Sequence, residues 1–378
     1  MTAFSGSFST VDLDDTEALL AADRDGALWA ASMAGAQVRA TAATVDEGAL
    51  DAVRSESRDY PPRTIIWLST RGTAATAGSL LAATRGDSAR APLVVAAEVP
   101  SWIGSLDVLI VAGDDPGDPA LVAAAAAGVR RGARVVVVAP YEGPLRDATA
   151  GRVAVLEPRI AVSAEFGLPR YLAAGLAILD ALEGAAAPTD LGALADELDA
   201  EALRNSAARE LFTNPAKMLA DRIVGRDVAL AGDCVATLAL ARHGSAVMLR
   251  IGRTTVAATG LADAVSVLRA QSASGRDVAD IFHDEQIDGP AADRLRVLAL
   301  TLAAERTVVA ARINGLHDVD LIAAGDVPVA PGASEETAST TVPVGGLSPG
   351  GPGRAEQQLA VLAVRLEMAA AYVRLLRS

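Results

Sequence analysis

The segment 107–140 places acidic residues where proteins commonly bind phosphate. An apolar run at 108–111 ends in a turn, and an alanine-rich segment leads to a second apolar run at 135–138. Such a strand–helix–strand unit often binds phosphate on the free N–H groups where its helix begins. The turn at 113–119 reads Gly-Asp-Asp-Pro-Gly-Asp-Pro, with three carboxylates and two prolines that lack an N–H. It is therefore either a phosphate-binding loop or the start of a helix.

The residue types of this turn favour the helix start. Asp118 can accept a hydrogen bond from the first helical turn, and Pro119 suits the first helical position. A phosphate dianion about 4 Å from Asp114 and Asp115 would be repelled by roughly a few kcal/mol near the protein surface. We therefore expect that the turn from Asp114 to Pro119 does not hold phosphate.

The elements that carry this turn alternate between strands and helices along the chain. Strand-like apolar runs occur at 64–68, 91–99, 108–111, 135–138 and 152–158, and again at 227–232, 246–251, 296–302 and 318–325. Helix-like segments separate most of these runs, a pattern that predicts parallel sheets covered by helices on both faces. The sequence therefore predicts an α/β protein with two doubly wound parallel-sheet domains, a helical linker and a long C-terminal helix.

We expect the first domain to span 1–205, beginning with a helical region and ending in the helical linker. The second domain then spans 206–378 and includes residues 329–353, which are rich in Gly, Pro, Ser and Thr. That composition predicts a flexible surface loop. The long helix that ends the chain is apolar on more than one face, which indicates packing on its own sheet or on a partner subunit.

Composition and charge exclude several classes of function. The net charge of −14 argues against a nucleic-acid or anionic-membrane partner. Cys234 is the single cysteine, and His243, His283 and His317 show no ligand spacing, so we expect neither a disulfide nor a metal site. The chain lacks a Gly-x-Gly-x-x-Gly turn after a strand, and we expect no dinucleotide or other cofactor. Short apolar runs and the lack of a signal-peptide pattern predict a cytoplasmic protein.

A short motif links the second series of elements to a known family. Residues 214–232 read NPAKMLADRIVGRDVALAG, with Asn214 as a helix cap and Pro215 at the first helical position. This segment resembles the bifunctional phosphoglucose/phosphomannose isomerases, in which an Asn-Pro-Ala-Lys helix precedes the second of two sugar-isomerase (SIS) domains. The resemblance implies a tandem SIS fold, a hexose 6-phosphate ligand and a homodimer, because the active sites of this family lie where subunits meet.

The resemblance also implies a substrate-binding loop after the first strand. The family loop Gly-Met-Gly-Gly-Ser corresponds here to Ser69, Thr70, Arg71, Gly72 and Thr73. Gly72 is retained, and Thr73 keeps a hydroxyl beside the N-terminus of the following helix. Arg71 replaces a glycine, and its forked donors either clamp a phosphate or fill the pocket.

The second family loop, Ser-Tyr-Ser-Gly-Asn-Thr, corresponds to the acidic turn at 114–119. Gly117 is retained, but aspartates and prolines replace the hydroxyl residues that hold the sugar phosphate in the family. We therefore expect any anion bound by the first domain to lie at residues 71–73.

The third family motif falls at 282–289, FHDEQIDG. The family has His-Asn-Glu-Ile-x-Gly, whose glutamate moves a proton between C1 and C2 of the open-chain sugar. Alignment on the isoleucine and the glycine places Gln286 at this base, and a glutamine cannot accept the proton. A shift of one residue offers Glu285 instead, with His283 nearby for ring opening. Residues 290–316 contain no counterpart of the family's second catalytic histidine.

These departures leave two hypotheses for the function. One is an active aldose–ketose isomerase of hexose 6-phosphates. The other is a catalytically degenerate SIS protein that senses a sugar phosphate, or serves as a regulatory partner subunit in mannose metabolism. The resemblance favours the first hypothesis, whereas the loss of the aligned base and of the loop hydroxyls favours the second.

Overall fold

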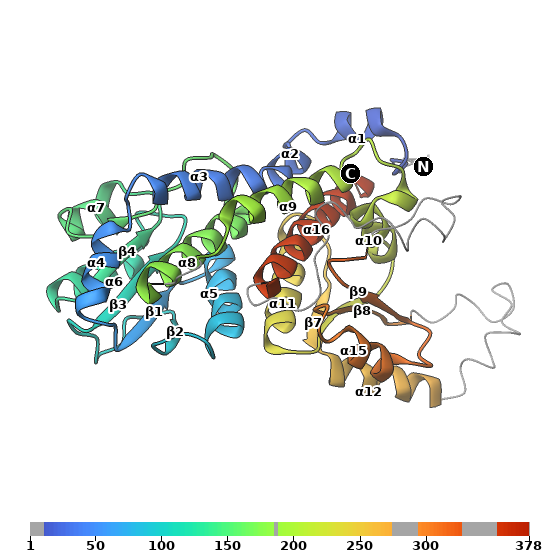
Figure 1. Cartoon of the computed structure of the whole chain (residues 1–378). Helices are drawn as coiled ribbons and strands as arrows, with labels where there is room; N and C mark the ends of the chain where they lie inside the picture. Colours follow the sequence, from blue (N-terminus) through green and yellow to red (C-terminus); the bar gives the residue numbers. More distant parts are fainter. Residues whose placement is uncertain (1–10, 185–187, 274–293, 327–353, 378) are drawn as a thin grey trace, which may run out of the picture.

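The computed structural model describes residues 11–184, 188–273, 294–326 and 354–377. Within them two parallel sheets are covered by helices (Figure 1), as the sequence predicts, with strand orders β2-β1-β3-β4-β5 and β7-β6-β8-β9. The strands are β1 (Thr64–Leu68), β2 (Leu93–Ala96), β3 (Asp107–Ala112), β4 (Arg134–Val138), β5 (Ala154–Val155), β6 (Val228–Gly232), β7 (Ala257–Gly260), β8 (Arg296–Leu300) and β9 (Val319–Ile322). The segment 329–353, for which the sequence predicts a flexible loop, lies outside the described residues.

The helices follow the predicted alternation. They are α1 (Thr16–Ala22), α2 (Ala27–Ser32), α3 (Ala34–Asp46), α4 (Asp51–Asp59), α5 (Gly72–Arg85), α6 (Pro119–Arg130), α7 (Gly143–Thr149), α8 (Leu168–Glu183), α9 (Leu191–Arg204), α10 (Pro215–Ile223), α11 (Val235–Arg250), α12 (Leu261–Ala273), α15 (Arg306–Ile313) and α16 (Arg354–Leu376). Asn214 caps α10 as expected, since its side-chain oxygen accepts the Lys217 N–H at 3.0 Å. Where one domain ends and the next begins stays a prediction.

The strands are apolar because both faces of each sheet are covered. Every residue of β3 is buried, and its sequence DVLIVA has no polar alternation, which is typical of parallel strands between two layers of helices. In the first sheet Ile66 pairs with Val94 on one side and with Leu109 on the other. The carboxyl ends of β1 and β3 are therefore neighbours, and the turns that follow them meet at one edge of the sheet.

One hydrophobic core connects the inward faces of the two sheets. Trp67 and Ile110 of the first sheet and Leu230 and Leu298 of the second belong to the same cluster of buried side chains. Helices α5, α8, α11 and α16 contribute to this cluster, and α5 packs directly against α11. Figure 1 shows long helices running between the two halves. The halves are therefore joined by packing, which fixes groups from one half close to groups from the other.

The C-terminal helix α16 is buried within its own chain. Its side chains from Leu359 to Val373 are all buried, and the helix packs against α2, α9, α10 and α11. Of the two interpretations of this apolar helix, packing within the chain is the observed one. Its apolar faces therefore give no support to a dimer, which stays a prediction from the family resemblance.

The single lysine of the chain fastens the N-terminal segment to α10. Lys217 is fully buried, and its ammonium donates to the backbone carbonyls of Leu13 at 2.6 Å, Ala207 at 2.9 Å and Arg209 at 2.5 Å. Burial lowers the pKa of this ammonium. The three carbonyls satisfy its three donors, so Lys217 has a structural role.

One predicted strand is wrong. Residues 246–250 are the last turns of helix α11 and Ile251 is its C-cap, and β7 (Ala257–Gly260) takes the place beside β6. Val247, Met248 and Ile251 are buried, and their spacing is that of one helix face. The apolar run was short, so its composition did not distinguish a buried strand from the last turns of a buried helix.

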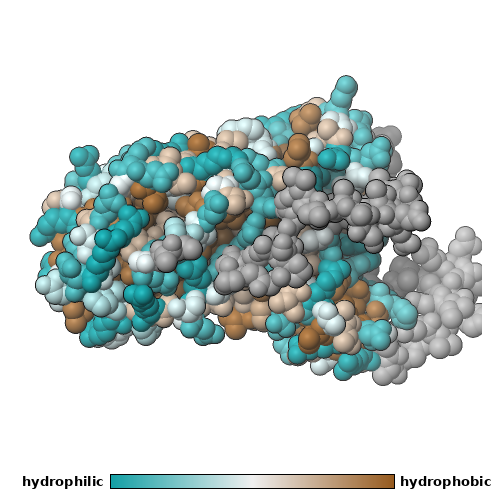
Figure 2. All heavy atoms as spheres, in the orientation of Figure 1, coloured by the Kyte–Doolittle hydropathy of each residue, from teal (hydrophilic) through white to brown (hydrophobic). Residues whose placement is uncertain are grey.

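The surface on the side of α3 and α4 is mostly hydrophilic. Figure 2 shows hydrophilic side chains over much of this face, with hydrophobic ones in small groups between them. Among the described helices we find none with the length and apolarity needed to cross a bilayer.

Candidate functional site

Two adjoining cavities lie at the carboxyl edge of the first sheet. The inner one, of about 210 Å³, and the outer one, of about 400 Å³, share Asp114 and Ala164. The inner cavity is lined by Arg71, Gly72, Thr73, Ala74, Asp114, Ala164, Glu165, Tyr171 and Arg250. Open parallel sheets bind ligands at this edge, and cavities of this size suit small molecules. We refer to the two cavities together as the first-sheet cleft.

Within the cleft, Arg71 lies beside the acidic turn, although its side chain is 59% exposed. Its guanidinium lies 3.4 Å from the Asp118 carboxylate, 3.8 Å from that of Asp115 and 4.0 Å from that of Asp114. The Thr70 hydroxyl also donates to Asp118, at 3.0 Å. The two turns therefore contact each other, and the positive charge of Arg71 is partly offset by three carboxylates.

Asp118 is the helix cap that the sequence predicts. Its side chain accepts the Ala120 N–H at 2.9 Å, and Pro119 occupies the first turn of α6. Burial by itself would raise the pKa of Asp118, but the hydrogen bonds from Ala120 and Thr70 and the charge of Arg71 outweigh it and lower that pKa. The carboxylate therefore stays charged, as a cap that also holds Arg71.

The other predicted phosphate-binding residues differ in whether their polar groups are free to bind a ligand. The Thr73 hydroxyl donates to the Ala164 carbonyl at 3.0 Å, so it is already used. The Ser69 hydroxyl is buried and lacks a hydrogen-bond partner within the described residues. Gly72 has a φ of 69°, a left-handed conformation that favours glycine, and it begins α5 without a side-chain cap. The first N–H groups of α5 are thus left for a ligand at the cleft.

Two residues that sequence reasoning missed carry the polar groups without partners in this cleft. Arg170 and Tyr171 lie in the first turn of α8 (Leu168–Glu183), and the Arg170 guanidinium lies 4.2 Å from the centroid of the Tyr171 ring. Arg170 Nη1 and the Tyr171 hydroxyl are both buried, and neither has a hydrogen-bond partner in the part of the chain that the structure describes. Burial lowers the pKa of Arg170 and raises that of Tyr171 to about 12.

Two buried polar atoms without a hydrogen-bond partner are costly to keep. The Asp114 carboxylate acts electrostatically on both side chains but accepts no hydrogen bond from either of these two atoms within the described residues. Arg170 lines the outer cavity, and Tyr171 lines the inner one. The sequence signal for this pair is an Arg-Tyr dipeptide at the start of a helix. Such dipeptides are too common to identify a binding site by themselves.

The second half of the chain contributes Arg250 to the same cleft. This residue ends α11, its side chain is exposed, and it lines the inner cavity. A Cβ added at Gly72 would lie 3.9 Å from Arg250 Nη1, so the arginine reaches the turn after β1. The site is therefore built by both halves of the chain.

The predicted catalytic residues cannot be placed. His283, Glu285 and Gln286 lie outside the described residues. Within the described residues, no group of three or more His, Cys, Asp or Glu side chains is arranged to hold a metal ion.

Comparison with known proteins identifies the fold. Neither known protein-family profiles nor curated protein sequences match the chain. Among solved structures it is similar to a phosphosugar isomerase candidate from Silicibacter pomeroyi DSS-3, with a TM-score of 0.60, 15% identity, and 92% of this chain and 96% of that one covered. It is also similar to tagatose-6-phosphate ketose/aldose isomerase from Escherichia coli, with a TM-score of 0.59, 15% identity and 90% of each chain covered.

A third similar structure is the C-terminal domain of glucosamine-fructose-6-phosphate aminotransferase from Francisella tularensis. Its TM-score is 0.58 at 10% identity, with 93% of this chain and 94% of that one covered. The chain thus shares the overall fold of these three structures, and the predicted α/β fold class with two parallel sheets is confirmed. Identities this low establish the fold and leave the particular activity to the residues of the site.

Proposed function

We propose that this protein binds a hexose 6-phosphate in the first-sheet cleft, with Arg170 as the main charge that receives the phosphate. The observation that carries this proposal is the buried Arg170 Nη1, which borders the outer cavity and lacks a partner among the described residues. A phosphate dianion would supply the missing hydrogen-bond acceptor for Arg170 Nη1. The fold shared with phosphosugar isomerases supports the same ligand class.

The polar groups around the cleft fit the sugar as well as the phosphate. The Tyr171 hydroxyl and the exposed Arg250 donate from the inner cavity, and Asp114 and Glu165 can accept hydrogen bonds from sugar hydroxyls. Arg71 contributes less to phosphate binding than its place in the loop suggests, because three carboxylates already surround it. The acidic turn is expected to repel a phosphate that approaches the start of α6.

We further propose that the protein senses the sugar phosphate or regulates a partner enzyme, with little isomerase activity of its own. The support is the alignment that places Gln286 at the base, together with the acidic second loop. The shared fold with a ketose/aldose isomerase supports the second candidate, aldose–ketose isomerisation with Glu285 as base and His283 in ring opening. In either case we expect a homodimer, for which light scattering should give about twice the chain mass of 38.4 kDa; the monomer mass would contradict it.

Isothermal titration calorimetry with fructose 6-phosphate, fructose and inorganic phosphate tests the binding proposal. We expect R170Q to weaken fructose 6-phosphate binding about tenfold or more, because a charge-assisted contact is lost. R71Q should have a much smaller effect, and R146Q, which changes an exposed arginine of α7, serves as the matched control. Unchanged binding in R170Q, or loss of binding in R71Q alone, would contradict the assignment.

A further inference from the structure

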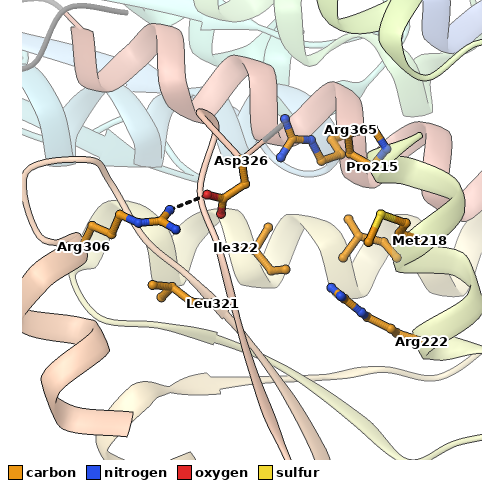
Figure 3. A pocket seen from close by; sticks show the side chains of 9 residues that line it. Pro215, Met218, Arg222, Arg306, Leu321, Ile322, Asp326 and Arg365 are labelled. Carbon is orange, nitrogen blue, oxygen red and sulfur yellow. Dashed lines mark hydrogen bonds and ion pairs between the residues drawn. The ribbon is translucent and has the colours of Figure 1, made fainter. Parts of the chain in front are cut away.

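A separate cavity of about 300 Å³ lies at the carboxyl edge of the second sheet (Figure 3). It is lined by Pro215, Met218, Leu219, Arg222, Arg306, Leu321, Ile322, Asp326 and Arg365. None of these residues lines the first-sheet cleft. We refer to this space as the second-sheet cavity. It lies where parallel sheets commonly bind ligands, at the end of β9.

The walls of the second-sheet cavity combine apolar and charged side chains. Met218 and Leu219 come from α10, and Leu321 and Ile322 come from the end of β9. Figure 3 shows Ile322 and Met218 on opposite sides of the space between these two elements. Apolar walls with a few placed polar groups are typical of sites for small molecules that carry a hydrophobic body.

One of the three arginines around the cavity is fully engaged by the protein. Arg365 is buried and forms a bidentate pair with Glu201, with N–O distances of 2.7 and 3.2 Å. It also donates to the carbonyls of Ala323 and Ala324, each at 3.0 Å. Burial would raise the pKa of Glu201, but the charge and hydrogen bonds of Arg365 outweigh it, and that pKa is lowered. Arg365 is therefore a structural tie between α9 and α16.

Arg222 is only weakly compensated. Its ion pair within the described residues is with Asp320 at 3.8 Å, and Asp320 already accepts the Arg296 Nε at 2.6 Å. The Arg222 side chain is 26% exposed, and Figure 3 shows its guanidinium directed toward the cavity. A guanidinium this close to apolar walls gains most from an additional anion.

Arg306 supplies a second positive group on the opposite side. It pairs with Asp326 at 2.5 Å, and its side chain is 47% exposed. Arg306 can therefore bind a second anion, and the Asp326 carboxylate, which is 34% exposed, would not be left buried and unpaired. Asp326 retains the Ala323 N–H at 2.8 Å as a partner. The cavity thus has an arginine on each side of its apolar residues, with the Asp326 carboxylate beside Arg306, in a chain whose net charge is −14.

We infer that the second-sheet cavity binds a small organic anion with an apolar body. Its carboxylate or phosphate lies between Arg222 and Arg306, and its apolar part packs on Met218, Leu321 and Ile322. The site is independent of the sugar-phosphate proposal, since it shares no lining residue with the first-sheet cleft.

Titration of the full chain with naphthoate, naphthyl phosphate and neutral naphthalenemethanol tests this inference, with naphthalene fluorescence as the readout. We expect one or both anions to bind, and the neutral compound to bind much more weakly. R222Q should weaken the anion about tenfold, and R306Q should weaken it by a smaller factor, because Asp326 already shares that charge. The matched control is R312Q, an exposed arginine on α15. The preference between naphthoate and naphthyl phosphate distinguishes a carboxylate ligand from a phosphate ligand.

Several outcomes would overturn the inference. These are equal binding of the neutral and anionic probes, R222Q and R306Q variants that both bind like the wild type, and loss of probe binding in R170Q. Thermal unfolding of each variant shows whether it is folded. If R222Q is unstable, R306Q still tests the inference, because Arg306 is exposed and its replacement should leave the fold intact. R170Q changes only the first-sheet cleft, whereas R222Q and R306Q change only the second-sheet cavity. A failure of the organic-anion inference is therefore distinguishable from a failure of the sugar-phosphate proposal.

Discussion

The Asp118 carboxylate accepts a hydrogen bond from the Thr70 hydroxyl at 3.0 Å and lies 3.4 Å from the Arg71 guanidinium. It therefore joins the turn after β1 to the turn after β3, at the edge of the sheet where a phosphate would lie. The contact explains why a loop at this position carries aspartates and prolines: it begins α6 and holds the neighbouring loop. The available positive charge of the cleft comes instead from Arg170, in the first turn of α8, and from Arg250, at the end of α11.

The first prediction concerns the stability that Asp118 contributes. D118A removes the cap of α6 and the contact with Thr70, so we expect the free energy of unfolding to fall by about 1–2 kcal/mol. Urea denaturation measures the change. D147A, at an exposed aspartate of α7, should change stability by less than about 0.5 kcal/mol. Equal stability of D118A and the wild type would show that the cap and the cross-link contribute nothing.

Lys217 gives a second prediction. K217M keeps most of the side-chain volume but leaves the carbonyls of Leu13, Ala207 and Arg209 without their charged donor. We expect a loss of about 3 kcal/mol, since two buried acceptors and one partly buried acceptor lose their partner. Hydrogen exchange should show faster exchange in α1 than in the first sheet. Uniform changes throughout the chain, or none, would refute the role of Lys217 in fastening the N-terminal segment.

The pair of His243 and Glu367 predicts a dependence of stability on pH. The two side chains are buried between α11 and α16, with 3.1 Å between Nε2 and Oε1, and burial raises the pKa of Glu367 despite the opposing contact with His243. An acid with a raised folded-state pKa contributes stability that is complete below its unfolded pKa. That contribution is lost as the pH rises through the folded pKa.

We therefore expect the stability of the wild type relative to E367Q to decrease from pH 4.5 upward. Denaturation at a series of pH values measures this difference, and E210Q, at an exposed glutamate, should run parallel to the wild type. A difference between the wild type and E367Q that grows with pH would mean that Glu367 is charged and stabilising in the folded protein.

The fourth prediction concerns catalysis. If Gln286 occupies the base position, activity with fructose, glucose and mannose 6-phosphates should be near background, because a general base contributes about 10²–10⁴-fold. Q286E should raise it only slightly, since the acidic turn still repels the phosphate. A coupled assay on the pure protein provides the measurement. Appreciable wild-type activity that E285Q abolishes would identify Glu285 as the base, and activity that survives E285Q would place the active site elsewhere.

Much of the fold could be predicted from the sequence because its signals are local. The apolar run at 64–68 matches β1 residue for residue, and Asn214 and Asp118 cap the helices they were expected to cap. The strand expected at 246–251 failed because the last turns of α11 are apolar enough to resemble a buried strand. The packing of α11 against α16 favours the helix over the strand, and this contact joins residues that are far apart in the sequence.

The candidate site was less predictable than the fold. The turn at 69–73 was placed correctly at the sheet edge, but the engagement of Arg71 depends on carboxylates more than 40 residues away in the chain. Arg170 and Tyr171 are adjacent in a sequence with many arginines, so nothing local marks them as a binding pair. Their lack of partners within the described residues becomes visible only once the fold has buried them.

The most direct test of the sugar-phosphate site is a crystal structure of the protein soaked with fructose 6-phosphate. We expect the phosphate to contact Arg170 Nη1 at the carboxyl edge of the first sheet, with the sugar reaching Tyr171 and the N-terminus of α5. A phosphate bound on the backbone of residues 114–119, or an empty first-sheet cleft beside a ligand bound elsewhere, would contradict the account.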